Sequence, residues 1–242
     1  MISFKAALIN ELLRLCRRNK LIVLTIIDIL ICIIYLTITK LTSLTELNMV
    51  FVNMSTNILS FFTNFILPIY VAIFTIECFS SQYNDKTIVT LLCRPITRFK
   101  IYLSKITTIS IFTLVHIMIV LITTLILNFS FNVHIFKLII SYFISIYPLI
   151  ALACTIALIA QLTKNGLFGM LFSLIFLIGT KVLQVLFIFP SAFLFTTYLD
   201  WYKIFLKATP SFIHILTSFS LITAYAVFTF ILGYLIFNKK EF

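Results

Sequence analysis

The stretch of sequence that decides the fold is LIVLTIIDILICIIYLTITKL, residues 21–41. Its only charged residues are Asp28 and, near the end, Lys40. A helix crosses the hydrocarbon core of a bilayer with roughly twenty mostly apolar residues. The charged segment before this stretch is long, and the apolar run lacks a small-residue cleavage site. The stretch therefore predicts a retained transmembrane helix rather than a cleaved signal peptide.

Five further segments have the same character. They are Ile58–Phe79, Ile101–Asn128, Ile135–Ala160, Leu167–Phe189 and Ile213–Phe237. Over the whole chain 62% of residues are hydrophobic and 10% are charged, whereas a soluble domain is about half apolar and a quarter charged. The sequence predicts an all-α integral membrane protein, in which residues 1–242 form a single transmembrane domain of six helices.

The orientation follows from lysine and arginine, which are retained on the cytoplasmic side of membrane proteins. One side of the expected topology carries thirteen of them: Lys5, Arg14, Arg17, Arg18, Lys20, Lys86, Arg94, Arg98, Lys100, Lys105, Lys164, Lys239 and Lys240. The other side carries four: Lys40, Lys137, Lys203 and Lys207. We expect both termini in the cytoplasm. The net charge of +11 is explained by this asymmetry rather than by nucleic-acid binding.

The first twenty residues predict a helix of their own. Phe4, Leu8, Leu12 and Leu15 recur at helical spacing among several basic residues. This pattern is typical of an amphipathic helix that lies along a membrane surface. The alternative is a charged extension of the first span.

The outer segment from Pro190 to Phe212 is long and rich in aromatic residues, including Trp201 and Tyr202. Trp and Tyr favour the membrane interface. A short re-entrant or interfacial helix before the sixth span is one interpretation. A loop that rests on the outer headgroups is the other.

Motifs for enzymatic chemistry are missing from the sequence. There is no P-loop pattern, no G-x-S-x-G or H-E-x-x-H, and no C-x-x-C among the five cysteines. The three histidines match no metal-ligand spacing. We therefore expect no catalytic residue, no metal and no cofactor bound by this chain.

Four polar residues inside the spans are candidates for a substrate path: Asp28, His116, Lys181 and Gln184. A charge at the centre of a bilayer costs at least about 2.5–3.5 kcal/mol on insertion scales, so such residues usually face a bundle interior or a water-filled path. The alternative is that the two charged groups snorkel towards the interfaces. At about 1.5 Å per residue, Asp28 and Lys181 differ in depth by about 10 Å, and His116 matches Lys181 better. Neither pairing follows from the sequence alone.

The most distinctive segment is ECFSSQYNDKTIVTLLCRPITR, residues 77–98, between the second and third spans. A carboxylate stands at the membrane edge, and a polar stretch, an apolar run and two arginines follow it. An amphipathic cytoplasmic helix with exposed apolar residues must bury them on headgroups or on a partner protein. Pro95 is placed to end or kink that helix.

This segment resembles the loop between helices two and three in six-helix permeases of type-2 ABC exporters. Glu77 stands where the family has a Glu at the end of helix two. Lys86-Thr87, Leu91-Leu92 and Pro95-Ile96-Thr97-Arg98 stand at the turn, the Leu pair and the Pro-[IV]-[ST]-Arg motif. Asp85-Lys86 replaces the family's glycine before the Thr. The topology, the N-terminal amphipathic helix and the basic C-terminus fit as well.

The resemblance implies a transport subunit whose ATP and Mg are bound by a separate cytoplasmic ATP-binding cassette protein. It implies a coupling helix that contacts this partner through Glu77, Asp85, Lys86, Thr87, Leu91, Leu92, Arg94, Pro95 and Arg98. It also implies a second permease copy, as a homodimer or heterodimer, in a bacterial cell membrane.

The function expected from this resemblance is export of a hydrophobic or amphipathic substrate, such as an antimicrobial or cytolytic peptide, a drug or a lipid-like molecule. Self-protection of a producing cell is a related role. A membrane-embedded, lipid-modifying enzyme and a non-transporting sensor or assembly subunit are the alternatives. The enzyme would need clustered acids or histidines near one interface, and the sequence does not suggest such a cluster.

Overall fold

The computed structural model describes residues 4–17, 19–42, 50–80, 96–127, 135–163, 165–186, 194–206 and 212–239. Within these ranges the secondary structure is helical and contains no strand. The predicted coupling helix falls on residues 81–95, which lie outside the described residues.

Within the described residues six helices are long and apolar enough to cross a membrane, as the sequence predicted. In chain order the spans are α2 (Lys20–Thr42), α3–η1–α4 (Val50–Phe61, Phe62–Ile66 and Leu67–Cys78), α7 (Arg98–Leu127), α8–α9 (Ile135–Ile144 and Ile146–Leu162), α10 (Gly166–Leu186) and α13 (Phe212–Lys239). A separate helix, α1 (Phe4–Cys16), precedes them. The 3-10 helix η2 (Phe195–Asp200) and the short α12 (Lys203–Leu206) lie between α10 and α13.

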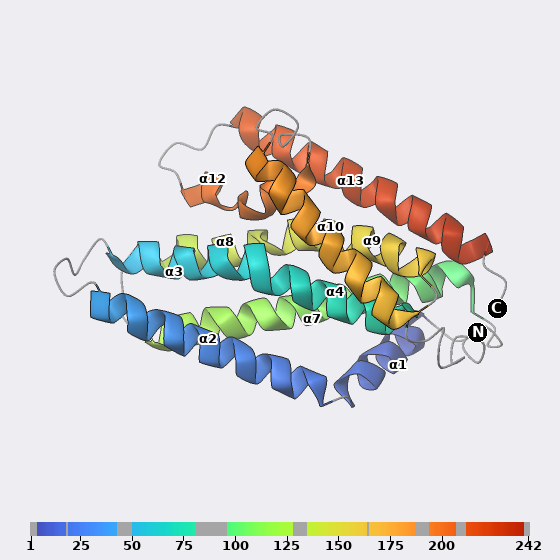
Figure 1. Ribbon diagram of the computed structural model, residues 1–242, viewed down its shortest axis with the longest axis horizontal. Coiled ribbons are helices and arrows are strands. Elements are labelled where there is room, and N and C mark those ends of the chain that lie inside the picture. Colours follow the sequence, from blue (N-terminus) through green and yellow to red (C-terminus); the bar gives the residue numbers. More distant parts are fainter. Residues whose placement is uncertain are drawn as a thin grey trace.

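The spans run side by side, so that the bundle has two ends (Figure 1). We call one the α1 end. It holds α1, the end of α4, the start of α7 and the end of α13. We call the other the α12 end, and it holds α12, α3 and α8. The predicted N-terminal helix is confirmed as a helix, and its buried residues are Ala7, Glu11 and Leu15. Its placement along a membrane surface stays a prediction.

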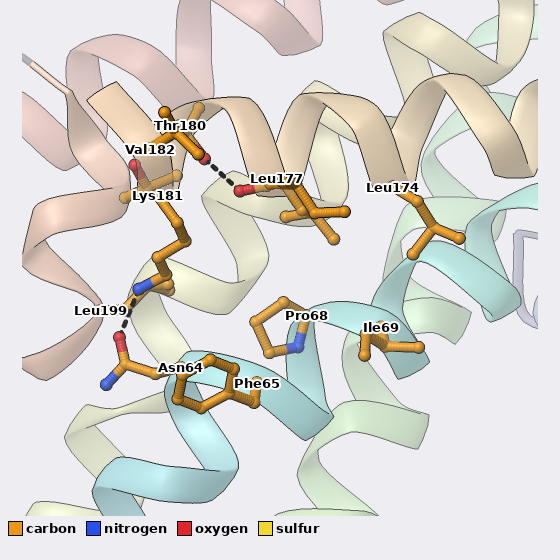
Figure 2. A pocket seen from close by; sticks show the side chains of 12 residues that line it. Asn64, Phe65, Pro68, Ile69, Leu174, Leu177, Thr180, Lys181, Val182 and Leu199 are labelled. Carbon is orange, nitrogen blue, oxygen red and sulfur yellow. Dashed lines mark hydrogen bonds between the residues drawn. The ribbon is translucent and has the colours of Figure 1, made fainter. Parts of the chain in front are cut away.

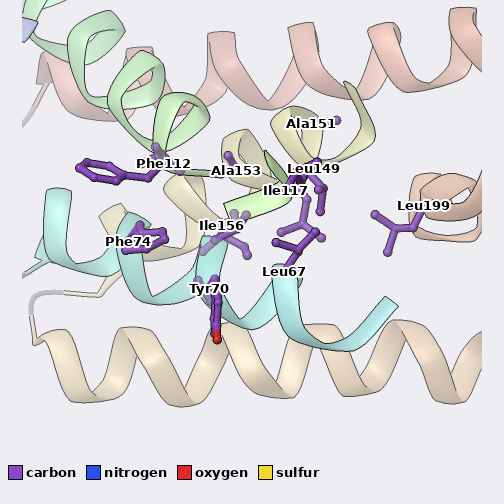
Figure 3. Packing of buried hydrophobic residues seen from close by; sticks show 14 of the residues in the cluster. Leu67, Tyr70, Phe74, Phe112, Ile117, Leu149, Ala151, Ala153, Ile156 and Leu199 are labelled. Atoms are coloured by element: carbon purple, nitrogen blue, oxygen red, sulfur yellow. The ribbon is translucent and has the colours of Figure 1, made fainter. Parts of the chain in front are cut away.

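The second and fourth spans form the centre of the bundle. In their most apolar stretches 67% and 61% of residues are buried, against 17% in α10 and 11% in α13. Figure 3 shows side chains of α4, α7 and α9 meeting in one cluster, among them Phe74, Phe112 and Ile156. Alanines such as Ala153 and Ala157, both fully buried, let neighbouring backbones approach α9 closely.

The fourth span is interrupted at Ser145, between α8 and α9. Pro148 lies three residues further on and has no N–H, so the carbonyl of Ile144 loses its normal helical donor. The indole Nε1 of Trp201 donates to that carbonyl at 3.1 Å. A side chain from the segment between α10 and α13 therefore satisfies the backbone group that the proline leaves open.

Candidate functional site: polar clusters along the bundle

At the α1 end a buried ion pair joins the N-terminal helix to the third span. Lys105 Nζ lies 3.1 Å from Glu11 Oε1, and the exposed fractions of the two side chains are 0% and 4%. Lys105 also donates to the carbonyl of Cys78 at 2.5 Å, and its ammonium lies 5.5 Å from the centre of the Phe79 ring. A buried charge is tolerated only when it is paired and hydrogen-bonded. Lys105 thus fastens α1 and the end of α4 to α7.

A second set of contacts extends this cluster to the first span. Arg14 pairs with Glu11 at 2.9 Å and donates to the backbone carbonyl of Glu77 at 3.2 Å. Lys20, in the first turn of α2, lies 2.5 Å from Glu77 Oε1. We call these five residues, Glu11, Arg14, Lys20, Glu77 and Lys105, the α1-end cluster. It connects α1, α2, α4 and α7.

The coupling residues predicted from the sequence are divided by the limits of the described chain. Glu77 ends the second span and belongs to the α1-end cluster. Arg98 begins α7, and its guanidinium donates to the carbonyl of Asn238 in α13. The other predicted coupling residues lie outside the described residues: Asp85, Lys86, Thr87, Leu91, Leu92, Arg94 and Pro95.

Midway along the bundle, Asp28 of α2 and His116 of α7 form a pair that depth estimates from the sequence did not suggest. Asp28 Oδ2 and His116 Nδ1 lie 2.5 Å apart, and the two side chains are at most 1% exposed. The rings of Tyr70 and Phe74 lie against the imidazole, at centroid distances of 4.9 and 5.5 Å. Among the described residues, Asp28 Oδ1 and His116 Nε2 have no hydrogen-bond partner. This pair holds α2 against α7 and does not line the cavity described below.

Towards the α12 end, Asp200 of η2 collects donors from the second span. Its Oδ1 accepts from Asn64 at 2.8 Å and from Thr63 at 3.2 Å. Its Oδ2 accepts from Ser60 at 3.1 Å and from Lys203 at 2.7 Å. Thr63 and Asn64 belong to η1, a π-helical turn that ends two residues before Pro68. Such π turns inside α-helices are frequent at functional sites.

Lys181 of α10 reaches the same region from the other side. Its ammonium donates to Asn64 Oδ1 at 2.6 Å. Gln184, one turn further along α10, donates to the hydroxyl of Thr196 at 2.7 Å. Lys181 pairs neither with Asp28 nor with His116, the two partners considered from depth in the membrane. Its partner is the neutral amide of Asn64. Asp200 and Asn64 were not singled out from the sequence, because only the fold brings η2 beside η1.

A cavity of about 320 Å³ lies between the second and fifth spans and ends at Lys181. Figure 2 shows the lysine side chain pointing from α10 towards Asn64, with Pro68 and Ile69 on the opposite wall. The residues that line it are mostly apolar: Asn64, Phe65, Pro68, Ile69, Leu174, Leu177, Ile178, Thr180, Lys181, Val182, Thr196 and Leu199. Its chemistry is that of a binding site for an apolar body with one polar end.

The fold and these clusters define a multi-pass membrane protein with six apolar helices. A family model described as ABC-2 family transporter protein matches residues 7–181, from α1 to the lysine at the cavity. The chain therefore belongs to the ABC-2 family of transporter proteins. Its role is that of a membrane transport subunit of an ABC system, which implies an ATP-binding partner. The search of curated proteins found no significant match.

Proposed function

We propose that this chain is the permease subunit of an ATP-driven exporter in a bacterial cell membrane, with both termini in the cytoplasm. The separate ATP-binding cassette subunit would bind ATP and Mg and dock at the α1 end. What supports this orientation is the distribution of basic residues, because most of them lie before or at the start of α2, between α4 and the first turns of α7, and at or after the end of α13. Cytoplasmic segments of membrane proteins carry this excess.

The observation that carries the proposal is the α1-end cluster. Residues 81–95 are flanked by the end of α4 and the start of α7. Glu77 lies at the first boundary and Lys105 within the first turns of α7, and the cluster ties both to α1. A partner that pulls on residues 81–95 would therefore move α1, α4 and α7 together. Differential binding of the ATP-bound partner to two packings of the bundle would drive the change.

The proposed cargo is hydrophobic or amphipathic: an antimicrobial or cytolytic peptide, a drug or a lipid-like molecule, with self-protection as a related role. The apolar cavity beside α10 supports this class. The outer faces of α10 and α13 also carry exposed large apolar residues, such as Phe172, Val185, Phe228 and Ile231. Lipid and a second permease copy are the surfaces that would cover them.

The test is co-expression with a candidate ATP-binding cassette subunit encoded beside this chain, followed by co-purification and an ATPase assay in nanodiscs. We expect a stable complex whose ATP hydrolysis increases with amphipathic peptides. Charge removal by Glu11→Gln with Lys105→Met should uncouple the peptide response and leave basal hydrolysis in place. Failure of the two chains to associate would contradict the proposal.

A further inference from the structure

Around Asp200 the described residues place two ammonium groups and a single carboxylate. Both oxygens of Asp200 are occupied, by Thr63 and Asn64 on Oδ1 and by Ser60 and Lys203 on Oδ2. Lys203 pairs with this carboxylate at 2.7 Å. Lys181 pairs with no carboxylate among the described residues, so one carboxylate faces two ammonium groups.

The ammonium of Lys181 also has donors to spare. A lysine ammonium carries three N–H groups, and within the described chain Lys181 makes one hydrogen bond, to Asn64 Oδ1. Asn64 is itself fixed, because its Nδ2 donates to Asp200 and to the carbonyl of Ser60. The amide therefore orients the lysine but supplies no negative charge. A cation held this way inside a transmembrane helix is costly until an anion reaches it.

The cavity next to this ammonium is shaped for an apolar chain. Phe65, Ile69, Leu177 and Ile178 line it, together with other apolar residues from α4 and α10. Its volume of about 320 Å³ lies at the lower end of the range for small-molecule pockets. Figure 2 shows Phe65, Ile69 and Leu177 along the cavity and Lys181 at one end of it.

We propose that this cavity binds an amphipathic anion, whose acidic headgroup, a carboxylate or a phosphate, is held by Lys181 and whose apolar tail lies between α4 and α10. As a statement about cargo, this rests on the proposed transport function. The occupant is chosen by charge complementarity: the lining offers one ammonium group, that of Lys181, and mostly apolar walls. A cationic amphiphile would be repelled by Lys181. A neutral amphiphile would leave the positive charge of Lys181 uncompensated.

The test measures binding of radiolabelled ten-carbon amphiphiles to the full chain in phosphatidylcholine nanodiscs, relative to empty nanodiscs. The probes are decanoate, decyl phosphate, decanol and decyltrimethylammonium. We expect the two anions to bind at least about tenfold more tightly than decanol, which corresponds to one charge-assisted hydrogen bond. Lys181→Gln should abolish this preference and Lys181→Arg should keep it. Lys137→Gln is the matched control, because Lys137 is exposed on α8 and does not line the cavity.

A second variant keeps the test decisive if the lysine substitutions disturb folding. Ile178 lines the cavity and is 63% exposed, so Ile178→Trp should narrow the cavity without a change of charge. This substitution should weaken the binding of decanoate and of decanol to the same extent. Equal binding of decanoate and decanol by the unaltered chain, or an undiminished preference in Lys181→Gln, would overturn the proposal.

A competition arm identifies the source of the anion. In this arm the chain is placed in nanodiscs that contain phosphatidylglycerol. Weaker decanoate binding there supports a bilayer lipid as the natural occupant, and unchanged decanoate binding supports a free amphiphile. Binding needs no ATP-binding partner. A chain that binds anions but finds no partner would contradict the proposed function alone, and a coupled exporter without anion preference would contradict only this inference.

Discussion

At the scale of single residues, Asp28 and His116 show what a membrane interior demands of polar groups. The two side chains are fully buried, and within the described part of the chain they are hydrogen-bonded to each other at 2.5 Å. Such pairs contribute little net stability compared with apolar residues, but the loss of one partner leaves an uncompensated charge. Their place between α2 and α7 makes them a packing contact of the bundle rather than part of the cavity wall.

We therefore predict that His116→Phe alone destabilises the bundle by about 3–5 kcal/mol, because Asp28 would remain buried without a partner. The double variant Asp28→Leu with His116→Phe should be close to the unaltered protein, since Tyr70 and Phe74 offer aromatic surface to the new ring. Denaturant unfolding in one detergent measures the free energy of unfolding of the single variant, the double variant and the unaltered protein. A double variant as unstable as the single one would show that the pair has a role beyond mutual compensation.

The sequence revealed intramembrane charges but not their partners. Asp28, Lys181 and Gln184 stand out because each is polar within an apolar run. Their partners depend on how each helix is rotated about its own axis. The position of a residue along a helix gives its depth in the membrane but not this rotation. Glu11 had a usable signal: it lies midway between Ala7 and Leu15 at four-residue spacing, and these are the residues that α1 buries. Lys105 is one of the basic residues that the sequence assigns to the cytoplasmic side, and its burial inside α7 was not predicted.

At the scale of helices, the second and fourth spans are irregular within the described residues, and both contact the segment between α10 and α13. The second span changes to a π turn at Phe62–Ile66, and the fourth span breaks at Ser145. Pro68 and Pro148 mark both places in the sequence. The side chains that contact these two places come from η2 and from the residue after it: Asp200 accepts from Thr63 and Asn64, and Trp201 donates to the carbonyl of Ile144.

The contact between Trp201 and Ile144 can be tested by a double-mutant cycle. Trp201→Phe should cost about 1–3 kcal/mol, because the part-buried carbonyl of Ile144 would lose its donor. In a Pro148→Ala background the helix recovers its own N–H at that position, so the same substitution should cost clearly less. Denaturant unfolding of the four proteins gives the coupling energy, and identical costs in both backgrounds would exclude this role for the indole.

Two helical glycines offer a matched comparison of close packing. A Cβ at Gly233 of α13 would collide with the hydroxyl of Tyr102 in α7, whereas a Cβ at Gly179 of α10 would meet nothing within 4 Å. Gly233→Ala should destabilise the bundle by about 1–3 kcal/mol through overpacking. Gly179→Ala should stabilise it by up to about 1 kcal/mol through helix propensity. Thermal unfolding midpoints that move in the same direction would contradict the packing of α13 on α7.

At the scale of the whole molecule, composition and the six apolar runs were enough to predict the architecture. The number of spans is confirmed, and the second and third begin earlier than expected, at Val50 and Arg98. The family was also predictable from residues 77–98, and the match over residues 7–181 confirms it. The α1-end cluster and the cavity could not be predicted from the sequence. The members of the cluster are spread over 94 positions of sequence, and the residues that line the cavity are spread over 135.

Coupling of residues 81–95 to the bundle is tested by one substitution beside this segment and one within it. Arg98→Glu and Leu91→Asp should each abolish transport while membrane insertion survives, because the first reverses a charge at the start of α7 and the second places a charge in the apolar run. Lys100→Glu, an exposed position two residues beyond Arg98, is the matched charge reversal and should leave most activity. Cargo efflux and surface accessibility of the chain are the measurements. Normal efflux in Arg98→Glu would refute the coupling role.

The most direct test of the central claim is transport itself. The chain and its ATP-binding partner would be reconstituted in liposomes, and uptake of a labelled amphipathic peptide into inverted vesicles would be followed with and without ATP and Mg. We predict accumulation that needs ATP, the partner and this chain together. Peptide movement that is independent of ATP, or hydrolysis by an intact complex that never moves any amphipathic cargo, would contradict the account.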